Sequence, residues 1–282
     1  MMIGKSPPQS RPRIRSFDKK HGCAAKTAHP TCITTEVNTV IKRGLSHEGL
    51  KTVACLTMLL DHIGAILVIS IIRQANGPVS VELAWLYYIL RCIGRTAFPI
   101  FCFQLVEGAF HTSHPSKYAM RLALGAVLAE IPFDLAFYGG PTWEHTNVMV
   151  TLLLGFAMVR GMQRANGFWK LPIILPFYMA ANLLHTDYSG KGILIIAMFA
   201  LTREMKHRKL LQLLGLILLS NNRVYHIRNI PIYMDRCKLL SLLPIFAYND
   251  RKRSRSKALQ WGFYLFYPVH ILLLYLLKIL LF

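Results

Sequence analysis

From about residue 50 onward, long apolar segments alternate with short polar connections. The first, LKTVACLTMLLDHIGAILVISII, runs from Leu50 to Ile72 and is long enough to cross a bilayer as a helix. The pattern predicts an all-α protein, a polytopic transmembrane helical bundle with about nine spans. The apolar segments lie at about residues 50–72, 84–110, 118–138, 147–160, 170–184, 191–202, 209–220, 231–248 and 259–282.

The polar connections alternate in charge, which predicts the orientation of the bundle. Every second connection is basic, as in HTSHPSK, RGMQRANGFWK, REMKHRK and YNDRKRSRSK, and basic connections usually remain in the cytoplasm. We therefore expect a multi-pass protein of the cytoplasmic membrane, with the N-terminus inside and the C-terminus outside. NNRVYHIRN breaks the rule, because Arg223 and Arg228 fall in a connection predicted to be external. The short apolar segments around it fit half-helices, a tilted pair or a re-entrant element.

Residues 1–45 differ in composition from the rest of the chain. They are basic and rich in Pro and Ser and have no hydrophobic periodicity, so we expect a disordered cytoplasmic tail followed by one transmembrane domain at residues 46–282. The chain carries 33 Lys and Arg against 13 Asp and Glu, a net charge of +20. Because these charges lie in the tail and in particular connections, we attribute them to membrane orientation and expect no nucleic-acid partner. The six cysteines match no standard zinc spacing, and we expect no metal.

Several ionisable residues interrupt the apolar segments. Asp61, Arg95 and Glu130 lie near the centres of three segments, where each costs roughly 3 kcal/mol if unpaired. We expect them to face the bundle interior, at one depth with His62 and His270. They are either structural ion pairs that join helices or parts of a reactive site.

Other polar residues fall nearer the ends of the segments. Glu107 and Arg121 are predicted to pair at the cytoplasmic ends of consecutive spans. Asp134 is placed toward the outer face, with Asn147 and the connection that contains Asp187.

His62 is the first candidate for a general base, because the pKa of histidine lies near neutrality. Asp61 and His62 are adjacent and point about 100° apart on a helix, so each requires a partner from another helix. On grounds of depth, Glu130 is a candidate for the carboxylate that orients His62, and His270 is the second candidate base.

The segment RCIGRTAFPIF predicts a break in the middle of the second span. Pro99 cannot donate a hydrogen bond to the carbonyl of Arg95, and Gly94 weakens the same turn. A broken helix exposes backbone amides that bind anions, and Arg91 and Arg95 flank this one. The segment is therefore either an ordinary proline kink or a site for a phosphate-bearing substrate.

Six motifs in order resemble the TraX family of membrane proteins, from about Leu50 to the C-terminus. They are LKTVACLTMLLDHIGAIL, IGRTAFPIFCFQLVEGAFHT, KYAMRLALGAVLAEIPFDLAF, NVMVTLLLG, DYSGKGIL and WGFYLFYPVHILLL. The resemblance implies an integral-membrane acetyltransferase that moves an acetyl group from acetyl-CoA to the amino terminus of a conjugative pilin. A family loop that usually reads like YNGxRG has Asp250 in place of its glycine here.

The chemistry of the ionisable and polar residues suggests roles that agree with this activity. We expect His62, Asp61, Glu130 and His270 to be catalytic, with His62 as the base or a transient acyl carrier. Acetyl-CoA would contact four cationic or basic residues: Arg91, Arg95, His111 and Arg121. The acceptor, a protein or peptide amine, would contact four polar residues nearer the outer face: Asp134, Asn147, Asp187 and Tyr188. A proton-coupled transporter that uses the mid-membrane Asp, Glu and His residues is the alternative, and a structural partner in an envelope assembly is a third.

Overall fold

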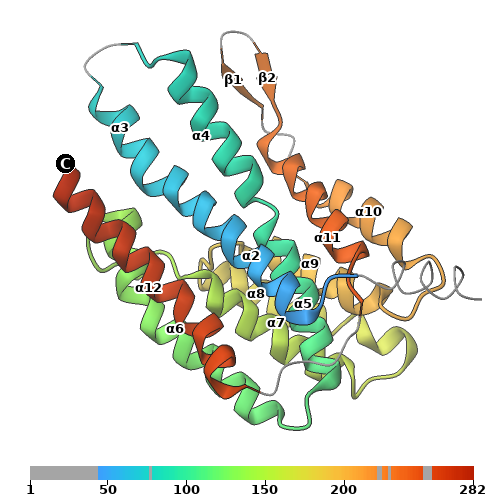
Figure 1. Ribbon diagram of the computed structural model, residues 1–282. Helices are drawn as coiled ribbons and strands as arrows, with labels where there is room; N and C mark the ends of the chain where they lie inside the picture. Colours follow the sequence, from blue (N-terminus) through green and yellow to red (C-terminus); the bar gives the residue numbers. More distant parts are fainter. Residues whose placement is uncertain (1–43, 76–77, 221–223, 228–229, 250–255) are drawn as a thin grey trace, which may run out of the picture. The chain divides into compact units, whose positions relative to one another are not determined.

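The computed structural model describes residues 44–75, 78–220, 224–227, 230–249 and 256–282, and these form the helical bundle that the sequence predicts. The helices are α2 (His47–His62), the π-helix η1 (Ile63–Val68), α3 (Ile69–Gln74), α4 (Val81–Gly94), α5 (Ala97–His111), α6 (Pro115–Tyr138), α7 (Val148–Met162), the 3₁₀-helix η2 (Gly167–Lys170), α8 (Ile174–Leu183), α9 (Ser189–Thr202), α10 (Arg208–Leu218), the 3₁₀-helix η3 (Met234–Ser241), α11 (Leu242–Phe246) and α12 (Lys257–Leu281). Two short strands, β1 (Tyr225–Ile227) and β2 (Ile230–Ile232), form an antiparallel hairpin (Figure 1). The predicted tail, the loop residues Arg223 and Arg228, and Asp250 lie outside the described residues, apart from the last two residues of the tail.

The first apolar segment forms one continuous rod of α2, η1 and α3. Ser46 caps its start, where the Ser46 hydroxyl accepts a hydrogen bond from the Gly49 amide at 3.0 Å. The π-helical turn begins directly after His62, and such turns are frequent at functional sites. The rod therefore changes its winding at the position of the paired ionisable residues.

The second segment is broken where the sequence predicts it. α4 ends at Gly94 and α5 begins at Ala97, so that Arg95 and Thr96 form the turn between them. Pro99 lies in the first turn of α5, where its missing amide costs nothing. The break lets two helices of one segment meet the bundle at different angles.

The helices pack around a core that α5 and α9 largely supply. α12 lies along α6 and also contacts α2, while α7, α8 and α9 pack together beside α5 (Figure 1). Ile100, Val106, Ile193 and Ile196 are fully buried between them. This arrangement places the middle of α2 against α4 on one side and α12 on the other.

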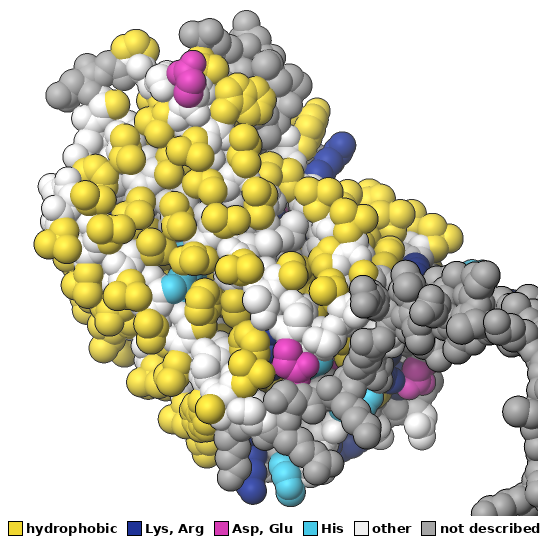
Figure 2. Space-filling model, in the orientation of Figure 1, with side chains coloured by type: hydrophobic (Ala, Val, Ile, Leu, Met, Phe, Trp, Pro, Cys, Tyr) yellow, Lys and Arg dark blue, Asp and Glu magenta, His cyan; other side chains and the backbone are white. Residues whose placement is uncertain are grey.

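The surface of the bundle is apolar over a wide area. Figure 2 shows hydrophobic side chains across most of one face. Over the described residues as a whole, the exposed large hydrophobic side chains include Leu56, Val127, Ile131 and Leu273. Exposed apolar surface of this extent is typical of contact with lipid. Among the described residues, three helical stretches are long and apolar enough to cross a membrane: His47–Gln74, Val81–His111 and Ala258–Leu281.

The predicted span at residues 118–138 forms the 24-residue α6, whereas several of the other predicted spans form shorter helices than expected. All nine apolar segments contain helix, but α7 and α9 have 15 and 14 residues, and helices of that length extend only about 22 Å. Segment 231–248 forms η3 and the five-residue α11. Asp235, Arg236 and Lys238 make its first half polar, which explains why no long apolar helix forms there.

Candidate functional site

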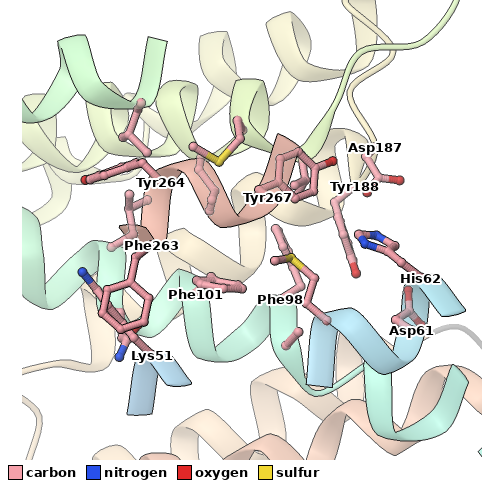
Figure 3. Close-up of a pocket in the computed structure, with 18 of the residues that line it drawn as sticks. Lys51, Asp61, His62, Phe98, Phe101, Asp187, Tyr188, Phe263, Tyr264 and Tyr267 are labelled. Carbon is pink, nitrogen blue, oxygen red and sulfur yellow. The ribbon is translucent and has the colours of Figure 1, made fainter. Parts of the chain in front are cut away.

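A pocket of about 110 Å³ lies inside the bundle, between α2, α5, α7 and α12. In Figure 3, Lys51, Phe263 and Tyr264 lie at one end, which we call the Lys51 end. Asp61, His62, Asp187 and Tyr188 lie at the other, which we call the His62 end. Phe98, Phe101 and Tyr267 line the stretch between them, so the pocket has two polar ends and an aromatic middle.

An ion pair holds Asp61 at the His62 end. The Arg91 guanidinium on α4 donates to the Asp61 carboxylate at 2.6 Å, and both side chains are only 15–16% exposed. Gly94, one turn beyond Arg91, packs directly against Asp61, and a Cβ at this position would lie 2.5 Å from the Asp61 Cγ. The close approach of α2 and α4 therefore requires glycine here.

His62 and His270 face each other from α2 and α12. The distance from His62 Nδ1 to His270 Nε2 is 2.6 Å, and the two rings are inclined by only 15°. His270 is 5% exposed, and its Nδ1 lies 2.6 Å from the carbonyl oxygen of Phe266. The ring of Tyr267 packs against both imidazoles. These contacts fix both rings at the wall of the pocket.

Asp187 and Tyr188 reach the pocket from the connection between α8 and α9. Two backbone hydrogen bonds tie this connection to the residue before Asn147: the Asp187 amide donates to the Thr146 carbonyl, and the Thr146 amide donates to the His185 carbonyl. His185 and Ser189 have φ angles of 44° and 47°, a region that is strained for residues other than glycine and is enriched at functional sites.

The Tyr188 ring stacks on the ring of Phe98, and Arg95 is close enough to interact electrostatically with Asp187 and Asp61. This end of the pocket thus combines carboxylates, a guanidinium, a phenol and an imidazole.

Cations also flank the Lys51 end. The Lys51 ammonium lies 5.2 Å from the centre of the Phe263 ring. The Arg121 guanidinium lies 5.5 Å and 5.7 Å from the rings of Tyr118 and Tyr264, both of which line the pocket. A cation over the face of an aromatic ring is attracted by the ring, so these contacts hold both side chains beside the aromatic wall of the pocket.

The structure brings together about half of the sequence-predicted site residues. Asp61, His62, Asp187 and Tyr188 line the pocket, and Arg91 and His270 contact two of them directly. The expectation that Arg91 stands ready for a phosphate does not agree with its ion pair to Asp61.

Other predicted contacts are replaced by different ones. Glu130 contacts the side chain of Asn147, so it does not orient His62, and His270 takes that place. The Asp134 carboxylate accepts a hydrogen bond from the Thr142 amide at 3.0 Å.

The predicted pair of Glu107 and Arg121 is also corrected. Glu107 binds Arg203 at 3.0 Å and lies 3.5 Å from His111. Arg121 points instead toward the rings at the Lys51 end. These corrections concern the direction in which each side chain points around its helix axis.

Sequence reasoning missed Lys51 and the aromatic residues of the pocket. Lys51 is the only charged residue between Leu50 and Leu60 of the first apolar segment, which was an available signal. Phe263, Tyr264 and Tyr267 belong to the aromatic run WGFYLFYP, which resembles an ordinary interfacial belt. Among the described residues, no group of three or more His, Cys, Asp or Glu side chains is arranged to hold a metal ion.

Comparison with known proteins agrees with the motifs. A family model described as "TraX protein" matches residues 46–278. The "Probable fimbrial assembly protein FimC, serogroup H1" of Dichelobacter nodosus is 33% identical over 249 residues, which cover 80% of this chain and 92% of that protein. No solved structure matches significantly. The chain therefore belongs to the TraX family of membrane proteins.

Proposed function

We propose that the protein is an integral-membrane acyltransferase that moves an acetyl group from acetyl-CoA to an amine. The acceptor is the N-terminus of a pilin or a related envelope protein, and the enzyme lies in the cytoplasmic membrane with its N-terminus inside. In this orientation Lys51, near the start of α2, marks the cytoplasmic end of the pocket. His111 and the N-terminus of α6 lie at the same end of the bundle, because the second half of α5 packs beside the start of α2 through Gln104 and His47.

The observation that carries this proposal is the chemical gradient along the pocket. Lys51 and Arg121 suit the phosphates of acetyl-CoA, which enters from the cytoplasm. The aromatic middle, with Phe98 and Phe101, suits the narrow pantetheine arm. His62 lines the pocket where the thioester would arrive, and Arg95, whose charge interacts with Tyr188, Asp61 and Asp187, supplies positive charge for the developing oxyanion.

The chemistry assigned to the His62 end is direct acyl transfer. The acceptor ammonium first releases one proton to water, and its neutral amine nitrogen then attacks the thioester carbonyl carbon, so that a C–N bond forms and the C–S bond breaks. His62 takes the proton that the nitrogen loses, and the leaving CoA thiolate receives that proton from His62. Atoms and charges balance with no further reactant, and the products are an amide and free CoA.

The acceptor is placed on the opposite side from the donor. Asp187 lines the pocket and is also exposed, so its carboxylate is accessible to an incoming ammonium group. The similarity to a protein named for fimbrial assembly supports a pilin-type acceptor. Donor and acceptor would then approach His62 from the two ends of one pocket.

The test is transfer of labelled acetyl from acetyl-CoA to a pilin N-terminal peptide by the purified protein in lipid nanodiscs. His62→Ala should lower the rate by about 10²–10⁴-fold, the contribution typical of a general base. The matched control is His114→Ala, which removes an exposed histidine before α6. Equal rates for wild type and His62→Ala would refute the assignment, and proton flux in liposomes without any transfer would favour the transporter.

A further inference from the structure

The hydrogen bonds of His270 determine which of its ring nitrogens carries a proton. The carbonyl oxygen of Phe266 can only accept a hydrogen bond, and it lies 2.6 Å from His270 Nδ1. The proton of neutral His270 must therefore reside on Nδ1, which leaves a lone pair on Nε2. The other described contacts of His270 are the rings of His62, Phe266 and Tyr267, so a charged imidazolium at this buried position would have no carboxylate to balance it.

The position of the proton on His270 determines which nitrogen of His62, across the interface between α12 and α2, carries a proton. His270 Nε2, now an acceptor, lies 2.6 Å from His62 Nδ1. His62 Nδ1 must then donate, and the single proton of the neutral His62 ring is used in that bond. His62 Nε2 is left with its lone pair, on a residue that lines the pocket.

We propose that His270 is a positioning residue that fixes His62 as the tautomer whose Nε2 is unprotonated and available to the pocket. This assignment rests on the proposed function, in which His62 accepts a proton from the acceptor amine. A general base requires a lone pair on the side of the substrate, and a partner on the other ring nitrogen is the usual means of securing it. Here a neutral imidazole and a backbone carbonyl do what a carboxylate does elsewhere, without adding a charge to the membrane interior.

The balance of charge around His62 agrees with a neutral resting ring. The titratable groups that face it are Asp61 on its own helix, Arg91 on α4, Asp187 and Tyr188 before α9, and Tyr267 and His270 on α12. Arg91 already neutralises Asp61, so neither is left to draw a proton onto His62. When His62 does take up a proton during transfer, His270 Nε2 continues to accept the bond from Nδ1–H and stabilises the transient imidazolium.

The first test reads the tautomer itself. NMR of the wild-type protein labelled with ¹⁵N-histidine reports the protonation of each ring nitrogen. The His62 signals are assigned by their absence from the spectrum of the labelled His62→Gln variant. We expect His62 Nδ1 to be protonated and Nε2 to be unprotonated at neutral pH. A protonated Nε2 with an unprotonated Nδ1 would overturn the proposal. This readout needs no acyl transfer, so it remains decisive even if the proposed function is wrong.

The second test compares two replacements of His270 in the transfer assay. His270→Gln keeps an oxygen that can accept from His62 Nδ1–H, whereas His270→Met fills similar space without an acceptor. We expect His270→Met to lower kcat by on the order of 10²-fold with the KM for acetyl-CoA unchanged, and His270→Gln to recover at least tenfold of that loss.

Other patterns would contradict the proposal. Equal losses in both variants, a full kcat in folded His270→Met, or a change confined to KM would each show that His270 acts only by packing. A variant that fails to elute as a monodisperse peak is set aside, and the tautomer measurement on the wild type then decides.

Discussion

Gly94→Ala is the substitution whose effect follows most directly from the geometry of the site. The added methyl group would lie 2.5 Å from the Asp61 Cγ, whereas unstrained carbon contacts are about 3.5–4.0 Å. The Asp61 Cβ lies closer still, and because Cβ does not move with the rotamer, no rotamer change relieves the overlap. α2 and α4 must separate by about 1 Å or Asp61 must leave its place beside Arg91.

The cost can be worked out from three contributions. Overpacking costs about 1–3 kcal/mol, and the higher helix propensity of alanine returns at most about 1 kcal/mol. Disturbing the ion pair of Asp61 and Arg91 adds about 1–2 kcal/mol, less than for a fully buried pair because both side chains are 15–16% exposed. The net destabilisation of about 1–5 kcal/mol lowers the thermal midpoint by about 2–20 °C in a chain of this size.

The assay is thermal unfolding in detergent, followed by the fraction that elutes as a monodisperse peak, together with acetyl transfer at a permissive temperature. Gly262→Ala on α12 is the matched control, because no neighbouring atom lies within 4 Å of an added Cβ there. It should leave the midpoint unchanged or raise it slightly. A Gly94→Ala protein as stable and active as Gly262→Ala would show that α2 and α4 do not meet as described.

Three further predictions concern the pocket. Lys51→Ala should raise the KM for acetyl-CoA about tenfold with kcat unchanged, as expected for the loss of one charge-assisted contact to a phosphate. The control Lys117→Ala, which removes an exposed lysine at the same end of the bundle, should leave the KM unchanged. Both are measured by kinetics at varied acetyl-CoA concentration, and equal KM values would contradict the donor orientation. Arg91→Gln should destabilise by about 1–3 kcal/mol, and Asp61→Asn added to it should restore part of the loss, because the lone carboxylate is then removed; strictly additive thermal shifts in the double-mutant cycle would disprove the coupling. Gly192→Ala should lower kcat about tenfold, since its Cβ would lie 2.8 Å from the Tyr188 Cβ and 3.1 Å from the Phe98 ring, and an unchanged rate would remove Tyr188 from the site.

Some features of the site were predictable because they depend on local sequence. Gly94 and Pro99 are five residues apart along one span, and together they specify the break between α4 and α5. The depth of His62 and His270 follows from counting residues from the ends of two apolar segments, and the two side chains do meet. Insertion energetics alone required that such residues face inward.

Other features depend on rotation about the helix axes, which one sequence does not specify. Glu130 was expected at the depth of His62, but its side chain contacts Asn147 at the start of α7. Glu107 likewise meets Arg203, at the end of α9, and not Arg121. Lys51 was overlooked because an isolated lysine near the start of a span is usually an interfacial anchor, and only the folded bundle places it in a pocket.

Cryo-electron microscopy of the wild-type protein in nanodiscs with a non-hydrolysable acetyl-CoA analogue is the most direct test of the central claim. The account predicts density for the analogue inside the pocket, with its phosphates beside Lys51 and Arg121 and its acyl group against His62. Density for the analogue at another site, with no added density in the pocket between Lys51 and His62, would contradict the proposed binding of acetyl-CoA in this pocket.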